Sequence, residues 1–149
     1  SSIASLTDHD TTDGCEEASQ ACAALGIAFV PGAEFTTLWR GREVHVVGLC
    51  LDRASAALQG HLAAVRERRV ARLTAMGAKL DAQGMPGTEL VAQVLALPGT
   101  PTRLHLARLL VEHGLVRDVE QAFDRWLRRG QPAAVAPEWP ELAAGVGAI

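Results

Sequence analysis

The sequence lacks the long apolar runs and the excess of positive charge that mark membrane proteins and proteins that coat nucleic acids. No stretch approaches the roughly 18 apolar residues of a membrane-spanning helix, and the N-terminus lacks the layout of a signal peptide. The formal net charge of -3 argues against a general nucleic-acid coat, although a local basic pocket remains possible. We therefore expect no membrane partner.

Cysteine is also scarce, and its spacing argues against a disulfide framework. The three cysteines, Cys15, Cys22 and Cys50, form no CxxC pair. This pattern is typical of reduced thiols inside the cell. We therefore expect a cytoplasmic protein with no disulfide partner.

The residues that are present suffice for about one ordinary domain with a real core. The chain has 149 residues, of which 48% are hydrophobic and 21% are charged. It does not begin with methionine, its first residues resemble the end of a strand, and its last residues, "ELAAGVGAI", resemble a shortened amphipathic helix. We therefore expect an internal piece of a longer protein.

The first third of the sequence has the pattern of three strands. Residues 3–7 predict a short buried strand. Residues 27–39 predict a second strand that is interrupted at Pro31-Gly32, and residues 42–51 predict a third. A tight turn at Arg40-Gly41 would join the second strand to the third as a hairpin.

Helices are expected between the first two strands and over most of the later sequence. The first covers residues 13–25, with Thr11, Thr12 or Asp13 as its N-cap and Gly26 as its end. Apolar residues recur at helical spacing over residues 54–129 and predict three or four helices without strands.

This order of elements predicts an α/β protein with three parts. An α/β portion covers residues 1–53, a helical lobe covers residues 54–130, and the chain returns to the α/β portion over residues 131–149. The three tryptophans, Trp39, Trp126 and Trp139, are expected to pack in the protein rather than stack on bases.

The side chains suited to chemistry gather near the ends of the predicted strands. His9 follows the first strand, where parallel α/β folds collect their functional groups. Glu34 follows the Pro-Gly pair, and His45 lies inside the apolar run "VHVVGL". The full set of candidates is Asp8, His9, Asp10, Asp13, Glu34 and His45.

The expected hairpin would bring two of these side chains together. A two-residue turn at Arg40-Gly41 places Thr36 opposite His45, with Glu34 diagonal to His45 on the same face. A carboxylate and a neutral imidazole suit zinc, manganese or iron. A hydrogen-bonded core histidine and a helix-capping Asp-His-Asp-Thr-Thr cluster explain the same residues, so both interpretations stay open at this point.

Three motifs in this order and spacing carry a family resemblance: "LTDHDTTDG", "PGAEFTTLW" and "EVHVVGL". They closely resemble the polymerase-and-histidinol-phosphatase (PHP) family of metal-dependent phosphoesterases. The most similar branch acts on nucleoside 3',5'-bisphosphates or on short RNA 5' ends. The similarity continues through "ERRVAR", "TPTRLHLARLLVEHG" and "RRGQPAAVAPEW", so it covers nearly the whole chain.

The resemblance implies part of a distorted seven-stranded (βα) barrel with a helical insertion lobe and a site for divalent metal ions. By motif match, His9, Glu34 and His45 would be catalytic metal ligands, with Glu34 as a bridging carboxylate. Asp8 and Asp10 would orient the ligands. Manganese is the expected ion, with zinc, iron or magnesium as alternatives. The family's opening His-x-His pair and closing Asp-x-His pair do not occur in this sequence.

The resemblance also implies that the helical lobe binds a phosphate of the substrate, and four of its side chains are the candidates. Arg68 and Arg72 are one helical turn apart and share a face, and arginine binds phosphate oxygens through paired hydrogen bonds. Arg103 and His105 follow Pro101 at a predicted helix start, where anions are favoured. A solvated helix face is the alternative explanation of the arginines.

The resemblance therefore implies a hydrolase that uses metal-activated water on a small phosphorylated nucleotide or a short oligonucleotide. This segment alone is expected to be inactive, because it has too few ligands. The alternatives are a truncated or degenerate non-catalytic module that binds nucleotide or a partner, and a hydrolase of C–N bonds on a related metal barrel.

Overall fold

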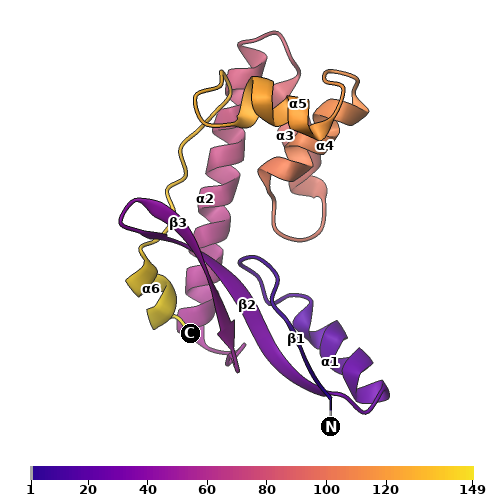
Figure 1. The fold of residues 1–149 in the computed structure, drawn as a ribbon, viewed down its shortest axis with the longest axis vertical. Helices are drawn as coiled ribbons and strands as arrows, with labels where there is room; N and C mark the ends of the chain where they lie inside the picture. The colour runs from indigo at the N-terminus through magenta and orange to yellow at the C-terminus, as the bar shows by residue number, and fades with distance from the viewer. Residues whose placement is uncertain (1) are drawn as a thin grey trace. The chain divides into compact units, whose positions relative to one another are not determined.

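A computed structural model describes residues 2–149, which divide into two compact units (Figure 1). One unit contains the described residues up to Arg66 together with Trp139–Ile149, and the other contains Glu67–Glu138. The division falls inside one long helix, α2 (Ala56–Asp81). The three-part domain boundaries expected from the sequence remain a prediction.

The first unit is built on a sheet with the strand order β1-β2-β3. β1 (Ile3–Leu6) is parallel to the first part of β2 (Ala28–Trp39), and helix α1 (Cys15–Ala24) connects them. β3 (Arg42–Leu49) is antiparallel to the second part of β2. These elements confirm the α/β class. The described residues contain this three-stranded sheet and not a complete seven-stranded barrel.

The Pro31-Gly32 pair does not interrupt the second strand, because β2 runs through it without a break. Pro31 is the last β2 residue to pair with β1, and Gly32 is the first to pair with β3. A Cβ atom on Gly32 would lie 2.8 Å from the Ser5 Oγ atom and 2.9 Å from the Thr7 Cγ2 atom. Glycine therefore permits a close approach of two chain segments at the point where β2 changes its partner.

The hairpin turn is confirmed. Arg40 and Gly41 both have positive φ, 50° and 74°, as a two-residue turn of type I′ requires. β3 ends at Leu49 and not at residue 51 as expected. The reason is that Cys50 has a φ of 58° and so leaves the extended conformation.

The start of helix α1 differs from the prediction. The helix begins at Cys15 with Gly14 as its N-cap residue, so the expected cap at Thr11, Thr12 or Asp13 is wrong. The Thr11 hydroxyl instead accepts a hydrogen bond from the Asp13 N–H, and the Thr12 carbonyl accepts one from the Cys15 N–H. These residues form the turn that precedes the helix.

The core of the first unit lies on one face of the β2–β3 hairpin. Ala33 and Phe35, which alternate with Glu34 along β2, are fully buried. They pack in one hydrophobic cluster with Leu51 and with Leu58 and Leu62 of α2. Because strand side chains alternate between faces, Glu34 points to the opposite face, which is therefore available for a site.

The second unit is helical, as expected. It contains the later part of α2, then α3 (Gly87–Ala96), α4 (Arg103–Glu112), α5 (Val119–Ala122) and the π-helical turn η1 (Phe123–Leu127). Figure 1 labels the four α-helices of this unit. Residues 67–138 form no strand. Across residues 2–149, no helix combines the length and the apolar character needed to cross a membrane.

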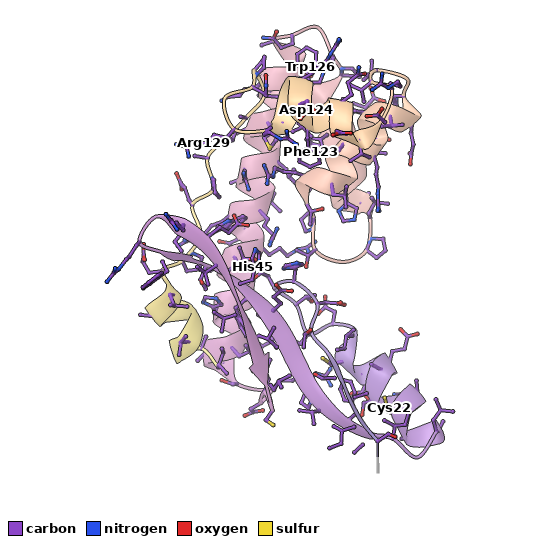
Figure 2. The ribbon with its side chains drawn as sticks, viewed as in Figure 1. Cys22, His45, Phe123, Asp124, Trp126 and Arg129 are labelled. Carbon is purple, nitrogen blue, oxygen red and sulfur yellow. The ribbon has the colours of Figure 1, made fainter. Side chains whose placement is uncertain are left out.

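The tryptophans differ in how they pack. Trp139 is 5% exposed, and Trp126, which Figure 2 shows beside Phe123 and Asp124, packs against the core of the second unit. Trp39 is 49% exposed, with the Arg40 guanidinium 4.8 Å from its ring centre. Packing was therefore correctly expected for Trp126 and Trp139 and not for Trp39.

The close approach at Gly32 predicts a measurable effect on stability. The Gly32→Ala variant should lose about 1–3 kcal/mol of unfolding free energy, because its Cβ atom would overlap two side chains and also lie 3.0 Å from the Gly48 carbonyl oxygen. Urea denaturation of the purified protein measures this loss.

Gly60→Ala is the matched control. Gly60 lies within α2 with no atom within 4 Å of an added Cβ, so this variant should gain about 0.5–1 kcal/mol from helix propensity. Equal stability of the two variants would contradict the packing described at Gly32.

Candidate metal site

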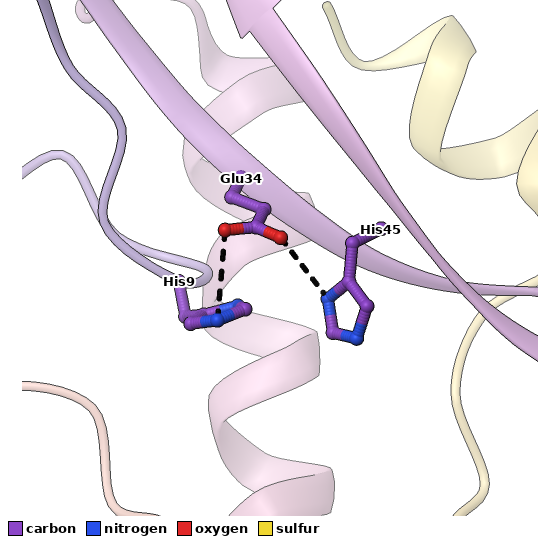
Figure 3. A group of neighbouring side chains, drawn as sticks. All are labelled: His9, Glu34 and His45. Atoms are coloured by element: carbon purple, nitrogen blue, oxygen red, sulfur yellow. Dashed lines mark ion pairs between the residues drawn. The ribbon is translucent and has the colours of Figure 1, made fainter.

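Three side chains that are distant in sequence meet on the open face of the hairpin. The His9 Nε2 atom lies 3.5 Å from the Glu34 Oε2 atom, and the His45 Nδ1 atom lies 3.5 Å from the Glu34 Oε1 atom. Figure 3 shows the carboxylate between the two rings, with one oxygen directed toward each. One possible ligand atom from each residue lies within 4.8 Å of the others.

The strand register places Glu34 and His45. Thr36 pairs with His45 and Glu34 pairs with Val47, so Glu34 is the diagonal neighbour of His45 on the same face. The register expected from the Arg40-Gly41 turn is thus confirmed. A shift of one residue would move either side chain to the core face and separate the pair.

His9 is placed by backbone hydrogen bonds from its two neighbours. The Glu34 N–H donates to the Asp8 carbonyl oxygen at 3.0 Å, and the Asp10 N–H donates to the Glu34 carbonyl oxygen at 2.8 Å. His9 and Glu34 therefore form a parallel bridge beyond the end of β1. This bridge puts the two side chains next to each other at the edge of β2.

Asp10 continues the same edge with its side chain. Its Oδ1 atom accepts a hydrogen bond from the Thr36 N–H at 2.8 Å, and Asp10 is only 4% exposed. Thr36 is fully buried, so its N–H requires a partner within the protein. The carboxylate thus supplies the acceptor that a neighbouring strand would provide.

The three donors fit one divalent cation. The two N···O distances of 3.5 Å exceed the usual range of about 2.7–3.2 Å for an N–H···O hydrogen bond. Two ligand atoms about 2.1 Å from one tetrahedral zinc ion lie about 3.4 Å apart. Two imidazoles and a carboxylate are also ligands that zinc, manganese and iron accept. These distances are longer than those of direct hydrogen bonds, and they leave the three side chains close enough to share an ion.

Two further side chains next to this group were not singled out from the sequence. The Glu43 Oε1 atom lies 3.2 Å from the His45 Nε2 atom, and the Glu43 Oε2 atom accepts a hydrogen bond from the Trp139 Nε1–H at 2.6 Å. Glu43 is two residues before His45 and so shares its face, which was a usable signal. Trp139 is 96 residues from Glu43, and no local pattern predicts their contact.

Arg68 and Arg72, which were expected to bind substrate, donate hydrogen bonds to carbonyl oxygens within the second unit. An Arg68 guanidinium N–H donates to the Glu138 carbonyl at 2.7 Å, and the Arg72 Nε–H donates to the Val135 carbonyl at 2.9 Å. Both arginines line a pocket of about 220 Å³ on α2. These contacts give both arginines a structural role within the second unit.

The other two expected phosphate binders lie at the start of α4, as the sequence indicated. His105 completes a capping box: its Nδ1 atom accepts a hydrogen bond from the Thr102 N–H at 3.2 Å. The Arg103 guanidinium lies 5.6 Å from the centre of the Phe123 ring. Both side chains thus have local contacts, and their binding of phosphate remains a prediction.

Comparison with curated proteins finds relatives over almost the whole chain. A 3',5'-nucleoside bisphosphate phosphatase of Chromobacterium violaceum is 39% identical over 148 residues, which are 99% of this chain and 52% of the relative. A 5'-3' exoribonuclease of Haemophilus influenzae is 37% identical over 147 residues, which are 99% of this chain and 53% of the relative. The resemblance to the PHP phosphoesterases is confirmed. No protein-family model matches the chain.

Solved structures show the same relationship. A structure from Chromobacterium violaceum, described as an amidohydrolase with bound sulfate and no metal, has a TM-score of 0.86 at 38% identity and matches 99% of this chain and 52% of that chain. A structure from Bifidobacterium adolescentis, described as a metal-dependent phosphoesterase, has a TM-score of 0.81 at 27% identity and matches 97% of this chain and 52% of that chain. The chain therefore spans about half the length of the relatives it matches.

The role of Asp10 at the edge of β2 leads to a second prediction. Asp10→Ala should lose about 1–3 kcal/mol, because the buried Thr36 N–H is left without its acceptor, and the Thr36 amide should exchange its hydrogen faster. Asp10→Asn should lose less, since its amide oxygen can accept and asparagine tolerates the positive φ of 52° at this position.

Amide hydrogen exchange together with thermal unfolding measures both variants. If Asp10→Ala kept the stability and the Thr36 protection of the unchanged protein, the proposed edge contact would be wrong.

Proposed function

We propose that the protein containing this chain is a metal-dependent phosphoesterase that hydrolyses phosphate esters of nucleotides. The observation that carries the proposal is the Glu34 carboxylate placed between the nitrogens of His9 and His45. The phosphatase and exoribonuclease relatives support a nucleoside 3',5'-bisphosphate or a short RNA 5' end as the substrate.

His9, Glu34 and His45 would hold the cation, and we propose manganese, with zinc, iron or magnesium as alternatives. When bound, a divalent ion polarises a phosphoryl oxygen and lowers the pKa of a coordinated water. All three side chains are partly accessible, at 47%, 28% and 36% for His9, Glu34 and His45. None of the three side chains is therefore sealed inside the core of the first unit.

The surrounding residues hold the ligands in place. Asp8 and Asp10 fix the backbone of Glu34, and through it the position of the carboxylate between the two rings. We also propose that the protein containing this chain has the barrel of the PHP family and the remaining metal ligands of that site. We expect the present segment alone to hydrolyse nucleotide phosphates poorly.

Four side chains of the helical unit are proposed to bind phosphate. Arg68 and Arg72 line one pocket and carry paired N–H donors that match phosphate oxygens. Arg103 and His105 lie in the first turn of the ten-residue helix α4, where the backbone dipole favours an anion. We propose these four residues as substrate contacts. We also propose that the enzyme is cytoplasmic.

Hydrolysis of a C–N bond is the second candidate, because one related structure is described as an amidohydrolase. A metal site of histidines and a carboxylate serves either reaction. A non-catalytic module that binds nucleotide is the third. Product analysis separates the three: phosphate release, amine release or binding without turnover.

The proposed ligands can be tested by phosphate release. With Mn²⁺ present, the intact protein should release phosphate from a nucleoside 3',5'-bisphosphate, and a chelator should stop the reaction. His9→Ala and Glu34→Ala should lower kcat/KM by at least about 100-fold, because each removes a ligand of the ion.

His113→Ala is the matched control. His113 hydrogen-bonds to Gln93 in the helical unit, so this variant should keep its activity within about twofold of the unchanged protein. Unimpaired activity of Glu34→Ala would remove this carboxylate from the proposed ligands, and amine release without phosphate release would favour the second candidate.

A further inference from the structure

Glu43 links the candidate metal site to a buried tryptophan. One of its oxygens lies 3.2 Å from the His45 Nε2 atom, and the other accepts the Trp139 Nε1–H at 2.6 Å. Trp139 is 5% exposed. The contacts form a continuous chain from Trp139 through Glu43, His45 and Glu34 to His9.

The two ends of the His45 ring face different carboxylates. The Nδ1 atom faces Glu34 at 3.5 Å, and the Nε2 atom faces Glu43 at 3.2 Å. A neutral imidazole has one N–H, so it can donate to only one of these carboxylates, and its other nitrogen presents a lone pair. A cation next to Nδ1 resolves this conflict, because both that lone pair and the Glu34 oxygen can bind it.

Trp139 determines how Glu43 can act. An indole N–H only donates, so the Glu43 oxygen that it contacts must be an acceptor. A short contact to a buried, bulky ring also fixes the plane of the carboxylate. The second oxygen of the Glu43 carboxylate lies 3.2 Å from Nε2 of His45, where a carboxylate oxygen can accept a hydrogen bond.

We propose that Glu43, held by Trp139, is a positioning residue that keeps His45 in the tautomer with hydrogen on Nε2. The Nδ1 lone pair is then directed to the cation beside Glu34. Histidines that bind metals commonly donate their other N–H to a carboxylate, and loss of that carboxylate lowers metal affinity about 10–100-fold. This inference rests on the metal site of the proposed function and adds two residues to it.

Glu43→Gln is the decisive variant, because glutamine has nearly the same shape. Its single carbonyl oxygen can accept from Trp139, but its NH₂ group then faces the Nε2–H of His45, and two donors cannot bond. Calorimetric titration of the intact protein with Mn²⁺ alone should show an affinity about 10–100-fold lower than that of the unchanged protein.

Two further variants separate this effect from general damage. Trp139→Phe keeps a buried ring but removes the N–H, and it should lower the affinity for Mn²⁺ by a smaller factor of about 3–10. Glu112→Gln removes a similar charge from the exposed end of α4, and it should bind Mn²⁺ within about twofold of the unchanged protein.

A spectroscopic measurement tests the tautomer directly. In the Zn²⁺-loaded protein, ¹⁵N NMR should show His45 with hydrogen on Nε2, and the Glu43→Gln variant should show weakened or altered Nε2–H signals. Equal Mn²⁺ affinity and an unchanged His45 tautomer in Glu43→Gln would overturn the positioning role while leaving the metal site intact. Failure of the unchanged protein to bind Mn²⁺ would overturn both this role and the proposed function.

Discussion

The site depends on the backbone hydrogen bonds that hold Glu34 in the middle of β2. On one side, the antiparallel register with β3 sets the diagonal to His45. On the other, the Asp8 carbonyl and the Asp10 N–H bond the backbone of Glu34 and carry His9 beside it. Neither contact alone would bring both imidazoles to one carboxylate. Glu34 is therefore paired on both edges of β2 at once, with the segment that follows β1 on one edge and with β3 on the other.

The later part of the same edge of β2 is paired by a segment near the end of the described residues. After β1 and the Asp10 carboxylate, the Pro140 carbonyl accepts the Leu38 N–H at 2.8 Å, and the neighbouring Trp139 reaches Glu43 on the adjacent strand. The end of the chain thus completes the edge and also contacts the residue behind His45. Two adjacent residues, Trp139 and Pro140, therefore contact both this edge and the neighbour of His45.

The sequence predicted what depends on local rules. The Arg40-Gly41 turn determines the hairpin register, and the alternation of strand side chains then predicts that Glu34 and His45 share a face. The sequence did not predict that Pro31-Gly32 lies within one strand, because the close approach of Ser5 and Thr7 to Gly32 is a tertiary contact. The Glu43–Trp139 contact also depends on how segments 96 residues apart come together, and no periodicity encodes this.

The central claim is that His9, Glu34 and His45 bind one divalent cation. Anomalous X-ray diffraction from crystals of the intact protein soaked in Mn²⁺ tests it most directly. The account predicts an anomalous peak about 2.0–2.3 Å from the His9 Nε2 atom, a Glu34 oxygen and the His45 Nδ1 atom. Fully occupied Mn²⁺ elsewhere in the protein, with Glu34 hydrogen-bonded directly to both histidines and no peak between them, would contradict it.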